Sequence, residues 1–172
     1  GKFSDLMRKI LEVSDKKEIT VEKEFELLDM YVSLEKSRFE NDFEYKISIS
    51  TSQDLSQYVI PSMIIQPFVE NAIKHGLMHK KGLKELKISG EIVNENWQFI
   101  IDDNGIGRAK AEQINKNFKS HKSFATNAIA SRIDLINKAS SSKIEIIIED
   151  KTSNTNEPLG TKIIVLIPVK IL

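Results

Sequence analysis

The sequence contains no cysteine, which excludes disulfide bonds, zinc sites built from thiolates and thiol catalysis. Neither sign of charge is in excess, because 25 basic residues balance 25 acidic residues. No overall field therefore attracts DNA, RNA or anionic lipid, and we expect no nucleic-acid partner. The sequence also has no apolar run near the roughly 20 residues that span a bilayer, no signal peptide and no internal repeat.

The remaining composition is that of a folded domain. Hydrophobic residues make up 40% and charged residues 29% of the 172 residues, which allows one sizeable core with a small appendage. The chain opens at Gly1 without a methionine. We therefore expect a piece of a longer protein, whose membrane segments would lie outside this piece.

Apolar residues three and four positions apart predict helices in the first 40 residues. A short helix should end near Ser14-Asp15, and a longer one should run from Thr20, as its N-cap, to about Phe39. The longer helix carries one apolar stripe, made of Val21, Phe25, Leu28, Val32 and Phe39. We interpret this stripe as an exposed face that docks on a missing helix or on a second subunit.

From residue 43 the apolar period changes to two, which predicts strands. The elements expected after this point are a strand over 43–49, a helix over 62–75 capped by Gly76, a hairpin over 86–101 that turns at 94–96, helices over 108–118 and 124–138, and strands over 144–148 and 161–169. The last strand is apolar on both faces, so we expect it inside the sheet. This order predicts an α+β fold, a two-layer α/β sandwich with a mixed, mostly antiparallel sheet and helices on one face.

Three stretches carry candidate chemistry. The first, over 61–76, places Glu70, Asn71, Lys74 and His75 on one polar face of the predicted helix. A carboxylate, an amide oxygen and a cation suit a hydrated Mg²⁺ that carries phosphates, because Mg²⁺ takes oxygen ligands and keeps several waters. The alternative is a solvated helix face with a surface pair between Glu70 and Lys74.

The second stretch is Asp102-Asp103-Asn104-Gly105-Ile106-Gly107. An ionised aspartate at a strand end can accept a hydrogen bond from the adenine amino group, and glycines let the backbone approach a base closely. Asp-Asn-Gly is also a hairpin signal, although the helix-like sequence over 108–113 argues against a hairpin here. The third stretch, Gly160-Thr161, opens the last strand and by itself is equally a simple turn.

In this order the three stretches resemble the N box and glycine boxes of the GHKL ATP-binding fold, also known as the Bergerat or HATPase_c fold. The run Pro-Ser-Met-Ile-Ile-Gln-Pro-Phe-Val-Glu-Asn-Ala-Ile-Lys-His-Gly over 61–76 is similar to LytS-type sensor histidine kinases. Residues 24–39 resemble the segment that joins the phosphoacceptor and ATPase modules of that family. The resemblance implies a helical segment over 1–40, from the end of the dimerisation and phosphoacceptor region, and an ATP-binding catalytic domain over 41–172.

The resemblance implies roles for the residues of the first stretch. Asn71 corresponds to the Mg²⁺ ligand of the family, and Glu70 to the acid/base residue of the N box. Lys74 and His75 are then expected near the phosphates, with a part in both nucleotide binding and catalysis.

The resemblance also implies an adenine site and a lid. Asp103 would accept the hydrogen bond from the adenine amino group, Gly105 and Gly107 would shape the wall beside it, and Thr161 would lie behind the base. Ser123 falls in the segment expected to close over the phosphates.

The implied reaction is transfer of the γ-phosphoryl group of ATP to a histidine, and from there to an aspartate of a response regulator, of the LytTR type. The family's phosphoacceptor lies in an Asn-Pro-His-Phe motif, which this sequence lacks. We therefore expect that histidine just upstream of Gly1, in a homodimeric full-length protein, and we expect this piece to bind ATP without phosphorylating itself. It would be the cytoplasmic domain of an inner-membrane sensor.

One departure from the family concerns the lid over 117–126. Ala125 stands where the family usually has a glycine before the helix that contains Arg132, and His121 is a further candidate for phosphate contact. The departure supports an alternative function, a catalytically weak or non-catalytic GHKL module that acts by protein contact. A stand-alone serine kinase of the anti-sigma-factor type is a second alternative, disfavoured by the helix before Phe39.

Overall fold

The computed structural model describes residues 1–117 and 122–172. Its main sheet consists of β2 (Phe43–Ser50), β4 (Lys84–Val93), β5 (Asn96–Asp103), β7 (Pro158–Pro168) and β6 (Glu145–Thr152), in that spatial order. A separate small sheet pairs β1 (Glu18–Thr20) with β3 (Val59–Pro61). These short strands were not predicted, because three residues show no usable alternation.

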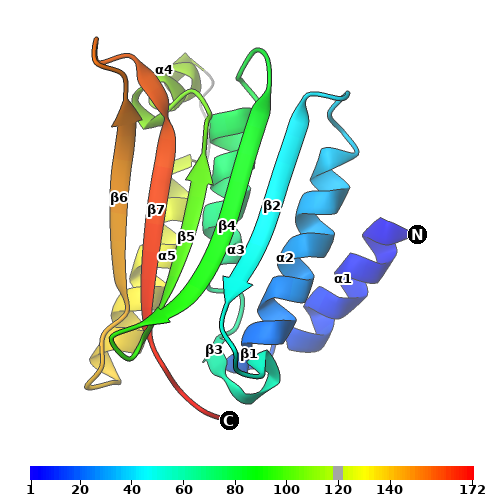
Figure 1. The fold of residues 1–172 in the computed structure, drawn as a ribbon, viewed down its shortest axis with the longest axis vertical. Coiled ribbons are helices and arrows are strands. Elements are labelled where there is room, and N and C mark those ends of the chain that lie inside the picture. The colour runs from blue at the N-terminus through cyan, green and yellow to red at the C-terminus, as the bar shows by residue number, and fades with distance from the viewer. Residues whose placement is uncertain (118–121) are drawn as a thin grey trace.

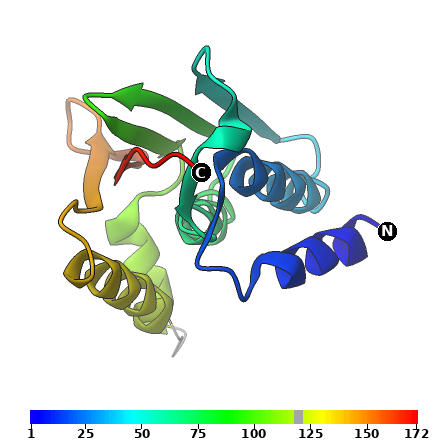
Figure 2. The same cartoon turned by 90° about the horizontal axis from the view of Figure 1, so that it is seen from below.

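The helices lie on one side of the main sheet (Figures 1 and 2). They are α1 (Lys2–Val13), α2 (Val21–Lys36), α3 (Gln66–Asn71) with its continuation η2 (Ala72–Leu77), α4 (Arg108–Asn117) and α5 (Lys122–Lys138), with one short 3-10 turn, η1, at Leu55–Gln57. The expected two-layer α/β sandwich is therefore confirmed. Within the described ranges, no helix is long and apolar enough to cross a membrane.

The strand pairing follows from the connections between strands. β4 and β5 form the predicted antiparallel hairpin, and its turn residues Asn94 and Glu95 both have positive φ, at 50° and 64°. This mirror-image turn matches the twist of the strands that it joins. β2 and β4 are parallel, which requires a crossover such as the one through α3. β7 has a neighbour on each side, as its two apolar faces indicated.

The apolar stripe of α2 lies in the core of this chain, so its interpretation as an exposed docking face is wrong. Val21, Leu28 and Val32 are fully buried, and the ring of Phe25 packs against Phe99 of β5 with centroids 5.4 Å apart. The sequence pattern shows only that the stripe needs a partner, and the core of the same chain, which includes Phe99 of β5, provides it.

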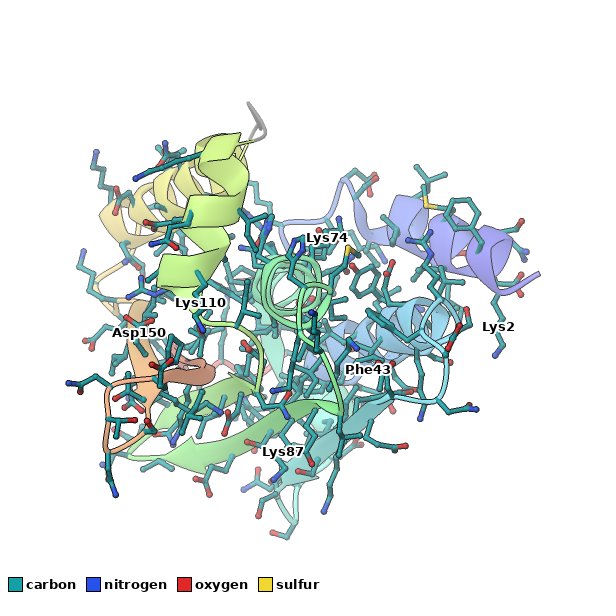
Figure 3. The ribbon with its side chains drawn as sticks, turned by 90° about the horizontal axis from the view of Figure 1, so that it is seen from above. Lys2, Phe43, Lys74, Lys87, Lys110 and Asp150 are labelled. Carbon is teal, nitrogen blue, oxygen red and sulfur yellow. The ribbon has the colours of Figure 1, made fainter. Side chains whose placement is uncertain are left out.

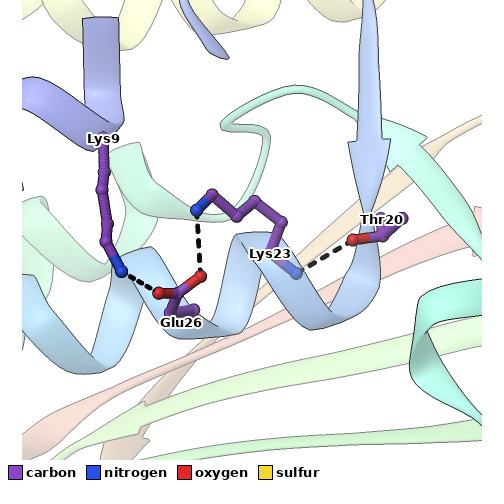
Figure 4. Close-up of polar contacts among 4 residues, drawn as sticks. All are labelled: Lys9, Thr20, Lys23 and Glu26. Carbon is purple, nitrogen blue, oxygen red and sulfur yellow. Dashed lines mark hydrogen bonds and ion pairs between the residues drawn. The ribbon is translucent and has the colours of Figure 1, made fainter. Parts of the chain in front are cut away.

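Polar contacts fix the start of α2 and join it to α1 (Figure 4). The predicted N-cap is confirmed, because Thr20 Oγ1 accepts a hydrogen bond from the Lys23 backbone N–H at 3.1 Å. The carboxylate of Glu26 binds both Lys9 of α1 and Lys23. The helix ends at Lys36, short of the predicted end at Phe39.

The predicted helix over 62–75 is shorter and differently built. It begins at Gln66, after a turn in which Met63 has a φ of 53°. Pro67 therefore lies in the first helical turn, where its missing N–H costs no hydrogen bond. The expected capping role of Gly76 is also wrong, because Gly76 lies inside the π-helical turn η2.

The burial of the α2 stripe leads to a stability prediction. Replacement of Leu28, which is 0% exposed, by alanine should lower the free energy of unfolding by about 2–5 kcal/mol, because it leaves a cavity in the core. Replacement of Leu11, which is 67% exposed, should change it by less than about 0.5 kcal/mol. Chemical denaturation measures both. If Leu28→Ala lowers the free energy of unfolding as little as the Leu11 replacement does, the stripe does not pack in the core and its interpretation as a docking face stands.

Candidate functional site

The three chemistry-bearing stretches meet at one end of the sheet. Asp103 is the last residue of β5, and Thr161 of β7 is its partner across the sheet. The backbone N–H of Ile106 donates to the backbone oxygen of Gly76 at 3.1 Å. The end of η2, the loop after β5 and the start of β7 therefore touch one another.

Missing side chains make this contact possible. A Cβ on Gly105 would lie 2.6 Å from the Cα of Gly76, and a Cβ on Gly76 would lie 2.9 Å from Oδ1 of Asp103. Gly160, at a φ of 118°, leaves no room for a Cβ against the backbone oxygen of Asp103. Glycines from all three stretches thus form a tight cradle around one aspartate.

Asp103 is the buried charged group of this cradle. The residue is 4% exposed, and its Oδ1 accepts the Gly105 backbone N–H at 2.8 Å. Burial raises the pKa of its carboxyl to about 6, against the lowering effects of the Gly105 N–H, of Lys151 and of the Thr161 backbone. At neutral pH the carboxylate is mostly ionised and close to its titration, so it can accept a strong hydrogen bond from a ligand.

Asn104 holds the loop that follows Asp103. Its side-chain oxygen accepts the Glu85 backbone N–H at 2.8 Å, and its amide group donates to the Leu83 backbone oxygen at 3.1 Å. The loop is therefore fastened to the start of β4. Gly107, at a φ of 80°, then turns the chain into α4, so the alternative of a hairpin at this motif is excluded.

The helical segment of α3 and η2 ends at the cradle through Gly76 and carries the predicted polar residues. The Gln66 side-chain amide donates to Oε1 of Glu70 at 3.1 Å, and Lys74 Nζ lies 3.8 Å from Oε2 of Glu70. This is the surface pair that the spacing allowed as an alternative. Lys74 projects on the side of the helix away from the sheet (Figure 3). Glu70, Asn71 and His75 are partly exposed.

The metal assignment is compatible with these positions but needs ligand oxygens from outside the chain. Within the described residues, the side chain of Asn71 forms no hydrogen bond, so its oxygen is available. No group of three or more His, Asp or Glu side chains in the described part of the chain is placed to hold a metal ion. A cation at Asn71 would therefore share its coordination with water and with the ligand.

The predicted lid falls on a part of the chain that is only partly described. His121 lies outside the described residues, and Ser123 and Ala125 lie outside those whose side chains are described. Their roles stay predictions.

Two residues beside the site were missed as functional candidates. Glu24 of α2 and Arg132 of α5 both bind backbone groups of the turn over 62–65. No local signal identifies such contacts, because their partners are main-chain groups far along the sequence. A glutamate next to an apolar stripe is the only hint in the sequence.

Comparison with known proteins relates the chain to histidine kinases. A family model described as histidine kinase matches residues 1–43. The sensor protein LytS of Bacillus anthracis is 30% identical over 159 residues, which cover 89% of this chain and 25% of that protein. The sensor histidine kinase BtsS of Escherichia coli is 35% identical over 86 residues, which cover 50% of this chain and 15% of that protein. The chain thus spans a quarter or less of the length of these two relatives.

Solved structures show the same fold. The mycobacterial sensor histidine kinase MprB aligns with a TM-score of 0.56 at 12% identity, over 90% of this chain and 98% of that one. The histidine kinase domain of the blue-light activated kinase from Erythrobacter litoralis aligns with a TM-score of 0.56 at 10% identity, over 89% of this chain and 68% of that one. The fold of this chain is that of histidine kinase catalytic domains.

The cradle leads to a prediction about its glycines. Gly105→Ala should lower the free energy of unfolding by about 1–3 kcal/mol, because the added Cβ meets backbone that must move. A Cβ on Gly76 would meet Oδ1 of Asp103, the oxygen that accepts the Gly105 backbone N–H, so Gly76→Ala disturbs the same local contact through its aspartate. The double variant should therefore cost measurably less than the sum of the two single ones in a denaturation-based cycle. Additive effects would mean that the two glycines do not share one contact.

Proposed function

We propose that this relative of the LytS-type sensor histidine kinases is the ATP-binding catalytic domain of a two-component kinase. The observation that carries the proposal is the convergence of the N-box helix, the Asp103 loop and Gly160-Thr161 in one cradle. These stretches are distant in sequence, and each is unremarkable alone. Their meeting around a single buried aspartate supports one shared ligand.

We propose that Asp103 recognises the adenine base. Its carboxylate is buried, held by a backbone N–H at 2.8 Å, and surrounded by glycines where a Cβ would intrude. A rigid acceptor in such a cradle discriminates in favour of a base that presents an amino donor. Gly105 and Gly107 shape the wall of the site, and Thr161 supports the base from β7.

The phosphates and Mg²⁺ would then lie along α3 and η2. Asn71 would supply one oxygen to the metal, the cation of Lys74 would balance phosphate charge, and His75 would donate a hydrogen bond to the phosphates. Glu70, held by Gln66 at 3.1 Å, would orient the acceptor group and take or give its proton. Bound Mg²⁺ neutralises charge that develops on the transferring phosphoryl group. Ser123 would contribute from the lid.

The reaction that we propose is transfer of the ATP γ-phosphoryl group to a histidine outside residues 1–172. The names of the relatives support this reaction, and they support a response regulator, of the LytTR type, as the next acceptor. We further propose a cytoplasmic position and a homodimeric full-length protein, in which residues 1–40 continue the dimerisation region. The exposed apolar side chains Phe3, Met7 and Leu11 of α1 support that continuation.

Isothermal titration calorimetry with Mg-ATP tests the binding step. The chain should bind, and Asp103→Ala should weaken binding by about 10-fold or more, because it removes a charge-assisted hydrogen bond of roughly 1.5–3 kcal/mol. Asp102→Ala is the matched control, since Asp102 pairs with Lys151 instead. No binding by the parent chain would leave the non-catalytic module as the better function. Equal binding by Asp103→Ala would remove only the adenine assignment.

The raised pKa of Asp103 predicts a pH dependence. The carboxyl is ionised above its pKa of about 6 and becomes protonated below it, where it is a poorer acceptor. The affinity ratio between the wild-type chain and Asp103→Asn, measured with ADP, should therefore fall about tenfold between pH 7 and pH 5. The phosphates of the nucleotide titrate in the same way with both proteins, so their effect cancels in the affinity ratio. A ratio independent of pH would contradict an ionised Asp103 in the site.

A further inference from the structure

The turn over 62–65, which leads into α3, is held from several directions. The Ser62 backbone N–H donates to the Lys17 backbone oxygen at 3.0 Å, and its hydroxyl donates to the Val13 backbone oxygen at 3.2 Å. Arg132 of α5 donates to the Ser62 backbone oxygen at 2.6 Å. The end of α1, the segment before β1, and α5 therefore all meet at Ser62.

Glu24 reaches the same turn from α2. Its Oε2 accepts the Met63 backbone N–H at 2.8 Å, and its Oε1 accepts the Ile65 backbone N–H at 2.9 Å. The first residues of a helix need such acceptors, because their N–H groups have no partner within the helix. Ile65, the N-cap of α3, provides no side-chain cap of its own. A carboxylate from another helix takes that place.

The position of Glu24 is costly, which indicates a role beyond filling the core. The residue is 1% exposed, and burial raises the pKa of its carboxyl to about 7, while the N–H groups of Ile65, Met63 and Gln66 and the charge of Arg132 lower it. A glutamine in this place avoids the cost of burying a charge, but it can accept only one of the two backbone N–H groups, because its NH2 group is a donor. We therefore expect Glu24→Gln to fold and to lose one of these bonds.

We propose that Glu24 is a positioning residue for the nucleotide site. It sets the direction of α3 by accepting hydrogen bonds from the backbone N–H groups of Met63 and Ile65, and Arg132 of α5 binds the same turn. This inference rests on the proposed function. α3 is short, and Asn71 lies about 9 Å along its axis from Ile65 at the usual rise per residue. A change of direction at the turn therefore moves the groups proposed for Mg²⁺ and phosphate. Asp103 is held by the β-sheet and Asn104, and Gly76 joins the far end of the same helical segment to the cradle. Loss of the bonds at residues 62–65 should therefore move the start of α3 more than it moves the cradle.

This difference between the two halves of the site gives the test. ATP binding is measured by calorimetry with Mg²⁺ and with EDTA, for the wild-type chain and for Glu24→Gln. The gain in affinity from Mg²⁺ depends on α3, whereas binding in EDTA depends on the adenine cradle. In Glu24→Gln the Mg²⁺-dependent gain should fall about 10-fold, as when a group that supports a metal ligand is removed. Affinity in EDTA should stay within about twofold, because Glu24 contacts no part of the cradle.

Leu28→Ala is the matched control. It destabilises the same helix but removes no hydrogen bond to the turn, so it should retain the full Mg²⁺-dependent gain at a temperature where it is folded. If Glu24→Gln loses affinity equally with Mg²⁺ and with EDTA, or retains the gain, the positioning role is wrong.

Arg132→Gln provides an independent variant, which decides the question if Glu24→Gln fails to fold. It removes the bond to Ser62 from a partly exposed side chain, and it should reduce the Mg²⁺-dependent gain several-fold in the same selective way. An unchanged gain in a folded Arg132→Gln chain would overturn the role of the turn. A wild-type chain that binds ATP equally with and without Mg²⁺ would overturn it as well, yet leave nucleotide binding intact. If the wild-type chain binds no ATP, the proposed function itself is wrong.

Discussion

The backbone contact between Gly76 and Gly105 is the constraint on which the site depends. It brings the end of the helical segment over 66–77 against the loop after β5, at a separation that no side chain permits. The hydrogen bond from Ile106 to Gly76 closes the contact. Without this approach, Asp103 and the polar face of α3 would belong to two separate surfaces. With it, the helical segment that carries this polar face ends at the cradle around Asp103.

Two buried carboxylates have different surroundings in this structure. Asp103 and Glu24 each lie in an apolar setting, and each is stabilised chiefly by backbone N–H groups. The difference lies in what surrounds them. Glycines from three segments pack closely around Asp103, whereas Glu24 is surrounded by the turn whose backbone N–H groups it binds. In our proposals the same chemistry, a desolvated acceptor, serves recognition of the base at Asp103 and positioning of α3 at Glu24.

The contacts of Glu24 and Arg132 also explain why the helical segment over 1–40 belongs to the folded unit. α2 buries its apolar stripe in the core, where Phe25 packs against Phe99 of β5. α1 is joined to α2 through Glu26, and both helices reach the turn before α3. A displacement of α1 or α2 would therefore also displace the start of α3. The path is short and consists of hydrogen bonds to backbone, which transmit direction better than apolar contacts do.

The sequence by itself determined the longer elements, the fold class and the identity of the motifs, because helical and strand periods, Thr20 as a cap and the Asp-x-Gly-x-Gly pattern are local properties. It could not determine where the stripe of α2 docks, since a stripe is equally suited to its own sheet or to another chain. The place of Gly76 inside a π-helical turn, and the reason for its missing side chain, depend on Asp103 from a distant strand. The sequence did not identify Glu24 as a functional candidate for the same reason. Its partners are main-chain N–H groups 39 and 41 residues away, which carry no sequence signal. Only the tertiary structure brings such groups within hydrogen-bonding distance.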